Sequence, residues 1–381
     1  TNKAIMIKTF TKFKRITTLL AGISMAAIPA VGQADWSFVG LGTAEGSSNA
    51  VAINDSGQVV GWSEGYAFIT GPNGIGKTTL GESDSFLPTD INNSGQVVGF
   101  SYNDSDNSNI RHAFITGPNG VGMTDLGTFG GKYTDPHAIN DSGVVIVSTY
   151  SDLSIAQVRA FITGPNGVGM TGLNLSGSID ARRFGINDSG QVVGSHNNQA
   201  FMTGPDGLGV TDLGPFKGPH LSDMFSYARD INDSGQVVGY AESPYYGNYH
   251  YGFITGPDGM GFTNLGVFTP IAINNSGEAV GDSTLFSHGG MTNLNLLDVV
   301  ISAGWSNLYV VDINNYGQMV GYGIDNNGHY HAFLLSYTPD TVFTPGPIIA
   351  PSIPEPETYA MLLSGLGLLG FMARRRKAAT A

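Results

Sequence analysis

The stretch INDSGQVVG at residues 53–61 decides the fold, because near copies of it recur through the chain. An Ile-Asn pair with Gly three residues after the Asn begins at seven positions: Ile53, Ile91, Ile139, Ile186, Ile231, Ile273 and Ile313. The copies lie 38 to 48 residues apart, which is the length of a four-stranded propeller blade. Asn, Asp and Ser bond locally in turns and Gly supplies a positive φ, so each copy predicts a turn that leads into a strand.

Two further features recur within the unit. A later strand contains Ala-Phe or a near variant, which predicts core rings between repeats at Phe68, Phe114, Phe161, Phe201, Phe253 and Phe333. Unit six is short, and Leu285-Phe286 are expected in this place. A Gly-Pro-Asn/Asp-Gly turn then begins at Gly71, Gly117, Gly164, Gly204 and Gly256, and it predicts a hairpin into a last strand.

The ends of the array favour a closed ring. The seventh unit stops after Phe333-Leu334-Leu335 without a last strand, whereas Trp36 to Gly42, ahead of the first unit, has that strand's pattern. A ring would use this strand to complete the last blade and remove two open sheet edges. The predicted fold is therefore all-β, a seven-repeat β-propeller over residues 35–338, with an open β-repeat array as the alternative.

Composition and charge exclude several kinds of site. The 381 residues include 55 Gly and no Cys, so disulfides, thiolate metal ligands and a Cys nucleophile are ruled out. All 30 acidic residues lie between Asp35 and Glu357, whereas nine of the 17 basic residues lie in the terminal segments outside this range. A body with this excess of negative charge repels phosphate backbones, and nucleic acid is not expected as a partner.

The N-terminal segment has the pattern of a signal peptide. Residues 1–34 place five cations ahead of an apolar run from Ile16 to Val31, and the segment ends with small residues. Signal peptidase is expected to cut between Ala34 and Asp35.

The C-terminal segment has the parts of a sorting signal. A Pro-rich linker covers residues 339–353, and residues 354–377 contain Pro354-Glu355-Pro356, an apolar stretch from Tyr359 to Met372, and the cations Arg374, Arg375, Arg376 and Lys377. Cations beyond an apolar stretch favour a cytoplasmic end. We expect a hydrophobic helix that anchors a precursor in the inner membrane.

Two stretches resemble known families. Residues 353–377 resemble the PEP-CTERM sorting domain of Gram-negative bacteria, which implies export, retention by this tail and processing near Pro-Glu-Pro by an exosortase-type membrane transpeptidase. It also implies delivery to the cell surface or extracellular space in a species that makes exopolysaccharide. The body, with strings such as His112-Ala113-Phe114, resembles the HAF repeats of extracellular bacterial proteins. That resemblance implies extracellular β-repeats and no particular reaction.

Three motifs resemble nucleotide-binding or metal-binding sites, but each has a simpler structural explanation. Residues 71–78, GPNGIGKT, match a phosphate-binding loop, but the same turn recurs without Lys and no helix is expected after it. Asn-Asp-Ser-Gly turns offer oxygen ligands for calcium, yet ordinary turn chemistry explains them, so no cofactor is expected and calcium stays an alternative. His329 and His331 are the close-spaced histidines, and with no carboxylate motif beside them we expect no metal site.

The expected function is binding. Tyr245, Tyr246, Tyr249 and Tyr251 form a candidate loop for stacking on sugar rings, with a solvent-shielding loop as the alternative. No unit departs from the repeat with a catalytic constellation, so no catalytic residue is assigned. We expect a non-catalytic, exported surface protein that binds or organises polysaccharide or another surface component; the alternative is an extracellular carbohydrate-active enzyme.

Overall fold

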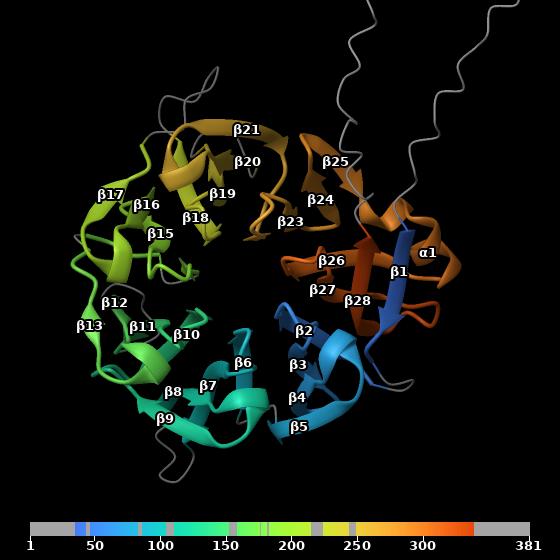
Figure 1. The fold of residues 1–381 in the computed structure, drawn as a ribbon, viewed down its shortest axis with the longest axis horizontal. Helices are drawn as coiled ribbons and strands as arrows, with labels where there is room; N and C mark the ends of the chain where they lie inside the picture. The colour runs from blue at the N-terminus through green and yellow to red at the C-terminus, as the bar shows by residue number, and fades with distance from the viewer. Residues whose placement is uncertain are drawn as a thin grey trace, which may run out of the picture. The chain divides into compact units, whose positions relative to one another are not determined.

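The computed structural model describes residues 35–42, 46–82, 86–103, 110–151, 158–175, 177–180, 183–214, 224–243 and 249–338. Across these residues the chain forms seven blades of four antiparallel strands arranged as a ring, and one parallel residue pair, Tyr133 with Arg111, joins the sheets of blades two and three (Figure 1). The predicted all-β propeller is thus confirmed. The blades are numbered one to seven after the order of the repeats.

Each blade runs from an inner strand beside the ring axis to an outer strand. The inner strands are β2 (Ser48–Ile53), β6 (Phe86–Ile91), β10 (Tyr133–Ile139), β14 (Gly185–Ile186), β18 (Phe225–Ile231), β22 (Ala272–Ile273) and β26 (Ser306–Ile313). The second strands are β3 (Val59–Ser63), β7 (Val97–Asn103), β11 (Val145–Tyr150), β15 (Val192–His196), β19 (Val237–Glu242), β23 (Ala279–Gly281) and β27 (Met319–Ile324).

The two remaining strands complete each blade. The third strands are β4 (Tyr66–Thr70), β8 (Ile110–Thr116), β12 (Arg159–Ile162), β16 (Gln199–Thr203), β20 (His250–Thr255), β24 (Thr284–Ser287) and β28 (Tyr330–Thr338). The outer strands are β5 (Lys77–Glu82), β9 (Met123–Gly127), β13 (Thr171–Gly172), β17 (Val210–Asp212), β21 (Phe262–Val267), β25 (Gly290–Asn293) and, in blade seven, β1 (Asp35–Gly40).

Short helical turns connect some of these strands. The five Gly-Pro-Asn/Asp-Gly turns form η1 (Pro72–Gly74), η2 (Pro118–Gly120), η4 (Pro165–Gly167), η5 (Pro205–Gly207) and η6 (Pro257–Gly259) between third and outer strands. Between blades six and seven lie η7 (Leu294–Leu296) and the five-residue helix α1 (Asp298–Ser302).

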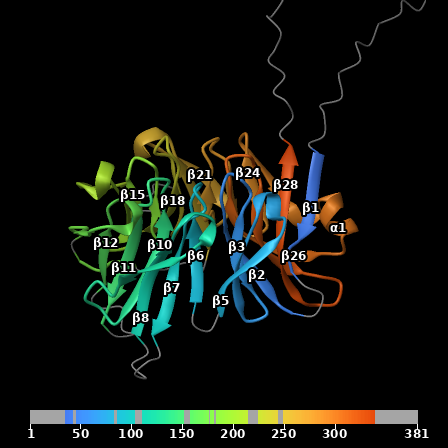
Figure 2. The same ribbon diagram turned by 60° about the horizontal axis from the view of Figure 1, so that its bottom comes forward.

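The N-terminal strand closes the ring. β1 pairs antiparallel with β28, from Asp35 opposite Thr338 to Gly40 opposite Phe333, and the two strands lie side by side in both views (Figures 1 and 2). The Phe38 ring lies 5.0 Å from the Trp305 ring and 5.6 Å from the Phe333 ring. The strand predicted from the Trp36 to Gly42 pattern therefore completes blade seven.

The core lies between neighbouring blades. Five of the six predicted rings are at most 1% exposed: Phe68, Phe114, Phe201, Phe253 and Phe333. Each of these lies opposite a Gly of the second strand. A Cβ at Gly99, Gly194 or Gly239 would lie within 3.1 Å of the facing ring, so the missing side chain leaves room for that ring. In blade three Val147 stands opposite Phe161, and that ring is only partly buried.

One predicted core position is wrong. In blade six Thr284 lies opposite Gly281, and Phe286 lies opposite Ala279. The hairpin of this blade is two residues shorter than the Ala-Phe pattern assumed, so Leu285, 3% exposed, supplies the buried side chain next to Thr284.

The repeated Asn joins each blade to the next. Its side-chain amide donates to the backbone carbonyl of the corresponding Asn one blade on, and this holds for Asn54, Asn92, Asn140, Asn187, Asn232, Asn274 and Asn314. The last bond runs from Asn314 to Asn54 at 2.9 Å. The junction between blades seven and one therefore has the same inner contact as the other six.

Candidate functional site

The inner strands direct side chains into a channel on the ring axis. In five blades the pairing of the inner and second strands skips one residue, and the skipped residues are Val51, Thr89, His137, Arg229 and Val311. All five line one axial cavity of about 90 Å³. Because a β-bulge turns a side chain out of the regular alternation, this position, two residues before the repeated Ile, faces the channel.

Three carboxylates line the same cavity. Asp90, Asp230 and Asp312 each accept a hydrogen bond from the N–H of the Ile that follows, at 2.8 Å. Each also accepts one from the corresponding Ile of the next blade, namely Ile139, Ile273 and Ile53, at 2.8–2.9 Å. The three side chains therefore join blades two to three, five to six and seven to one.

Burial shifts the pKa values of the titratable side chains that line the channel. It raises the pKa of Asp90 to about 7 and that of Asp230 to about 6, against the opposing effect of the backbone hydrogen bonds. The pKa of Asp312 is raised well above its usual value, first by burial and then by Asp90. The Arg183 guanidinium acts in the opposite direction on Asp90 and Asp230. Burial also lowers the pKa of His137 to about 4, so its imidazole is neutral at pH 7.

A wider compartment continues the channel toward the starts of the inner strands. It has a volume of about 240 Å³, and Asn49, Thr89, His137 and Arg183 line it. The Oδ1 atom of Asn49 is buried and has no hydrogen-bond partner among the described residues. An acceptor, a hydroxyl, an imidazole and a guanidinium thus meet in one cavity, which suits a small ligand rich in hydroxyl groups.

The opposite end of the channel carries a ring of seven Asp and Asn side chains around a cavity of about 170 Å³. The Oδ1 atom of each accepts the backbone N–H of its counterpart one blade earlier, at 2.8–3.0 Å, and the residues are Asp55, Asn93, Asp141, Asp188, Asp233, Asn275 and Asn315. One oxygen of every carboxylate is therefore already used to join blades. Calcium binding at these turns stays the alternative to a purely structural role.

The predicted tyrosine loop is described in part. Tyr249 is 60% exposed, as a ligand-stacking residue should be. Tyr251 lies in β20, pairs with Ala241 and packs against the core between blades four and five. Tyr245 and Tyr246 lie outside the described residues.

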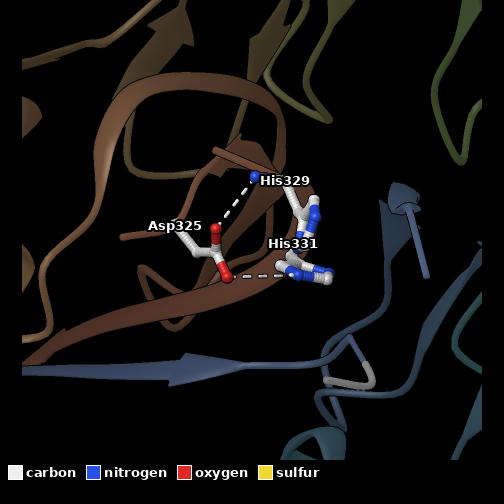
Figure 3. Close-up of side chains that lie close together, drawn as sticks. All are labelled: Asp325, His329 and His331. Atoms are coloured by element: carbon white, nitrogen blue, oxygen red, sulfur yellow. Dashed lines mark hydrogen bonds and ion pairs between the residues drawn. The ribbon is translucent and has the colours of Figure 1, made fainter. Parts of the chain in front are cut away.

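The hairpin between β27 and β28 brings a carboxylate to the paired histidines. Asp325, His329 and His331 place one potential ligand atom each within 4.8 Å of one another (Figure 3). The expectation that no carboxylate accompanies these histidines is wrong, because the hairpin folds Asp325 back onto them.

The phosphate-loop match has the structure of a hairpin. Residues 72–74 form the turn η1, and Lys77 begins β5, so no helix receives the glycine loop. The Lys77 ammonium lies 4.6 Å from the centre of the Phe68 ring. This cation–π contact accounts for the Lys without a nucleotide.

The terminal predictions fall outside the described residues. These are the cleavage residue Ala34, the motif Pro354, Glu355 and Pro356, and the cations Arg374, Arg375, Arg376 and Lys377; Asp35 is exposed at the start of β1. Within the part of the chain that the structure describes, no helix has the length and hydropathy needed to cross a membrane.

Comparison with protein families supports the assignment of the tail. Residues 352–377 match the model of the PEP-CTERM protein-sorting motif. Such a motif implies an exported protein that is processed at the membrane and is a substrate of exosortase. No curated protein matches the chain in sequence.

Solved structures resemble the body in fold alone. Oligogalacturonate lyase from Vibrio parahaemolyticus is 10% identical, with a TM-score of 0.52 over 80% of this chain and 97% of that one. The β-propeller domain of the Trilobed protease from Pyrococcus furiosus, described as having an open velcro topology, is 9% identical, with a TM-score of 0.50 over 78% and 99%. TolB from Acinetobacter baumannii is 12% identical at a TM-score of 0.41, and the match covers 60% of this chain and about half (54%) of TolB.

Proposed function

We propose that this chain, exported under a PEP-CTERM sorting motif, is a non-catalytic surface propeller whose axial channel binds polysaccharide. Signal peptidase and an exosortase-type enzyme would process a membrane-held precursor, and the propeller would then act at the cell surface or in the extracellular matrix. The motif supports the export step. The binding role rests on the channel.

The observation that carries the binding role is the compartment of about 240 Å³ beside Asn49. A buried oxygen without a partner costs about 1–3 kcal/mol, and a ligand hydroxyl would remove that cost once the Asn49 side chain turns its Oδ1 atom into the compartment that it lines. Arg183 offers donors on the same wall, although one of its N–H groups already donates to the Ile271 carbonyl. The terminal sugar of a glycan chain would donate a hydrogen bond to Asn49 and accept one from Arg183.

Charge favours an uncharged glycan. The acidic residues of the body greatly outnumber its basic residues, so an anionic polysaccharide would be repelled at long range. The channel carboxylates also accept two backbone hydrogen bonds each. Because these hydrogen bonds occupy the carboxylates in joining the blades, they support a binding role over general acid or base catalysis.

A glycan array with the full-length chain, with and without calcium, tests the proposal. We expect neutral glycans among the hits. Asn49→Ala should weaken binding at least about tenfold without lowering the melting temperature, because it removes a buried oxygen that has no partner in the free protein. Arg183→Ala should weaken binding similarly.

The matched control is Arg159→Ala, since Arg159 is an exposed residue of β12 away from the channel. It should bind as the parent does. Absence of any glycan hit, or full binding in both channel variants, would overturn the proposal. Turnover of a bound glycan would instead support the enzyme alternative.

A further inference from the structure

The hairpin between β27 and β28 holds Asp325 in a fixed position. The Oδ1 atom of Asp325 accepts hydrogen bonds from the N–H groups of Asn327 and His329, at 2.8 and 2.9 Å. The backbone N–H of Asp325 donates to the His329 carbonyl at 3.0 Å. Oδ1 and the backbone thus define the hairpin. Oδ2 is directed at His331 (Figure 3) and also accepts the Asn327 side-chain amide at 3.2 Å, a bond that a metal ion would replace.

We propose that Asp325, His329 and His331 bind a divalent transition metal ion, with Zn²⁺ as the representative ion. The Nε2 atom of His331 lies 3.4 Å from Asp325 Oδ2. Two ligands of a tetrahedral ion with bonds of about 2.1 Å are about 3.4 Å apart. This edge of the coordination tetrahedron is therefore already formed, and His329 lies within 4.8 Å of it.

The ligand set selects the class of metal. Two imidazoles and one carboxylate suit Zn²⁺ and its neighbours, whereas calcium and magnesium prefer oxygen ligands alone. The exposure of the three residues fits an accessible site: the His331 side chain is 5% exposed, that of Asp325 is 16% exposed, and His329 is at the surface. An ion could enter past His329 and keep water at a fourth position.

The buried histidine connects the site to ring closure. The Nδ1 atom of His331 is buried without a hydrogen-bond partner among the described residues, and it faces Gly42, where an added Cβ would approach within 2.5 Å. Gly42 follows β1, and Ser48 of β2 accepts a hydrogen bond from the N–H of Ala332. A metal that holds His331 should therefore also stabilise the contacts of β28 with Gly42 and Ser48.

Titration of the full-length chain, without an affinity tag, with ZnCl₂ tests the site. Calorimetry should show a Zn²⁺ site that is lost in His329→Ala. At about 100-fold excess of Zn²⁺ over Kd, the melting temperature should rise by several degrees. Ca²⁺ at the same concentration should give neither effect. His329→Ala removes an exposed side chain, so without metal it should melt as the parent does.

Two further variants make the result specific. Asp325→Asn keeps an oxygen for the hairpin hydrogen bonds and should lower Zn²⁺ affinity at least about tenfold. His112→Ala is the matched control, because His112 contacts one carboxylate, Asp125, and belongs to no group of three ligands in the described part of the chain. Absence of Zn²⁺ binding, or equal binding by parent and His329→Ala, would overturn the inference.

Discussion

At the scale of the residue, the repeat uses Asn and Asp at adjacent positions for different reasons. The first position needs a donor: Asn232 gives its amide hydrogens to the Asn274 carbonyl at 3.0 Å and to Gln236 Oε1 at 2.9 Å. Its Oδ1 accepts the N–H of Gln236 at 3.0 Å. The second position needs only an acceptor, which Asp and Asn both supply. This explains why the first position is Asn in all seven units and the second varies.

Exchanging the two residue types should therefore have opposite effects. Asn232→Asp would turn a carboxylate oxygen toward a carbonyl in a buried site, and should lower the free energy of unfolding by about 3 kcal/mol. Asp188→Asn should raise it by about 0.5 kcal/mol, because burial and the neighbours Asp141 and Asp233 raise the pKa of Asp188. Urea denaturation measures both. Equal changes in the two variants would contradict this division of roles.

At the scale of the element, the two turns at one end of a blade pack against each other. In blade one the N–H groups of Asn73 and Gly74 donate to the carbonyls of Ser56 and Gly57. Asn73 has a positive φ of 54°, which Asn and Asp tolerate better than most residues. The Asn/Asp choice in Gly-Pro-Asn/Asp-Gly is thus a requirement of the turn.

Two glycines of blade one allow the effect of backbone conformation on stability to be distinguished from the effect of close packing. Gly57 (φ 76°) and Gly76 (φ 72°) share a left-handed backbone, but a Cβ at Gly57 would lie 2.7 Å from the Asn73 nitrogen, whereas nothing lies within 4 Å at Gly76. Gly57→Ala should cost about 3 kcal/mol and Gly76→Ala about 1 kcal/mol. Thermal melting of the two variants gives the comparison. Equal losses would mean that the turns do not pack closely.

The spacing of the repeats and the residues of the turns predict the strands and turns, but they do not predict the channel. The seven turns and five of the six core rings follow from residues that recur in the repeat, and the closing strand follows from the matching pattern at Trp36 to Gly42. Asn49 and Arg183 lie further ahead of the repeated Ile, whereas several other channel residues come from the two positions before Ile-Asn, such as Thr89-Asp90 and Arg229-Asp230. These positions vary between units, and only the bulge turns them to the axis. Variation at these two positions, inside a repeat that is otherwise strict, is the sequence feature that could have indicated the channel.

At the scale of the whole molecule, the ring depends on β1. Phe38 is partly buried against Trp305 and Phe333, whereas Val39 on the same strand is 50% exposed. Phe38→Ala should lower stability by about 2 kcal/mol, and Val39→Ala should change it by less than about 0.5 kcal/mol. Deletion of residues 35–40 should expose the edge of β28 that β1 covers and cause aggregation. Unchanged melting and hydrodynamic radius after the deletion would contradict closure by this strand.

The position of β28 has a mechanical consequence. This strand is hydrogen-bonded to β27 on one side and to β1 on the other, and it ends at Thr338, opposite Asp35. A pulling force applied at Thr338 along the strand would load both rows of hydrogen bonds in shear, so that many bonds must break together. A strand at a free edge would instead peel away one bond at a time. Blade seven is therefore built to bear tension at the point where the chain leaves the propeller.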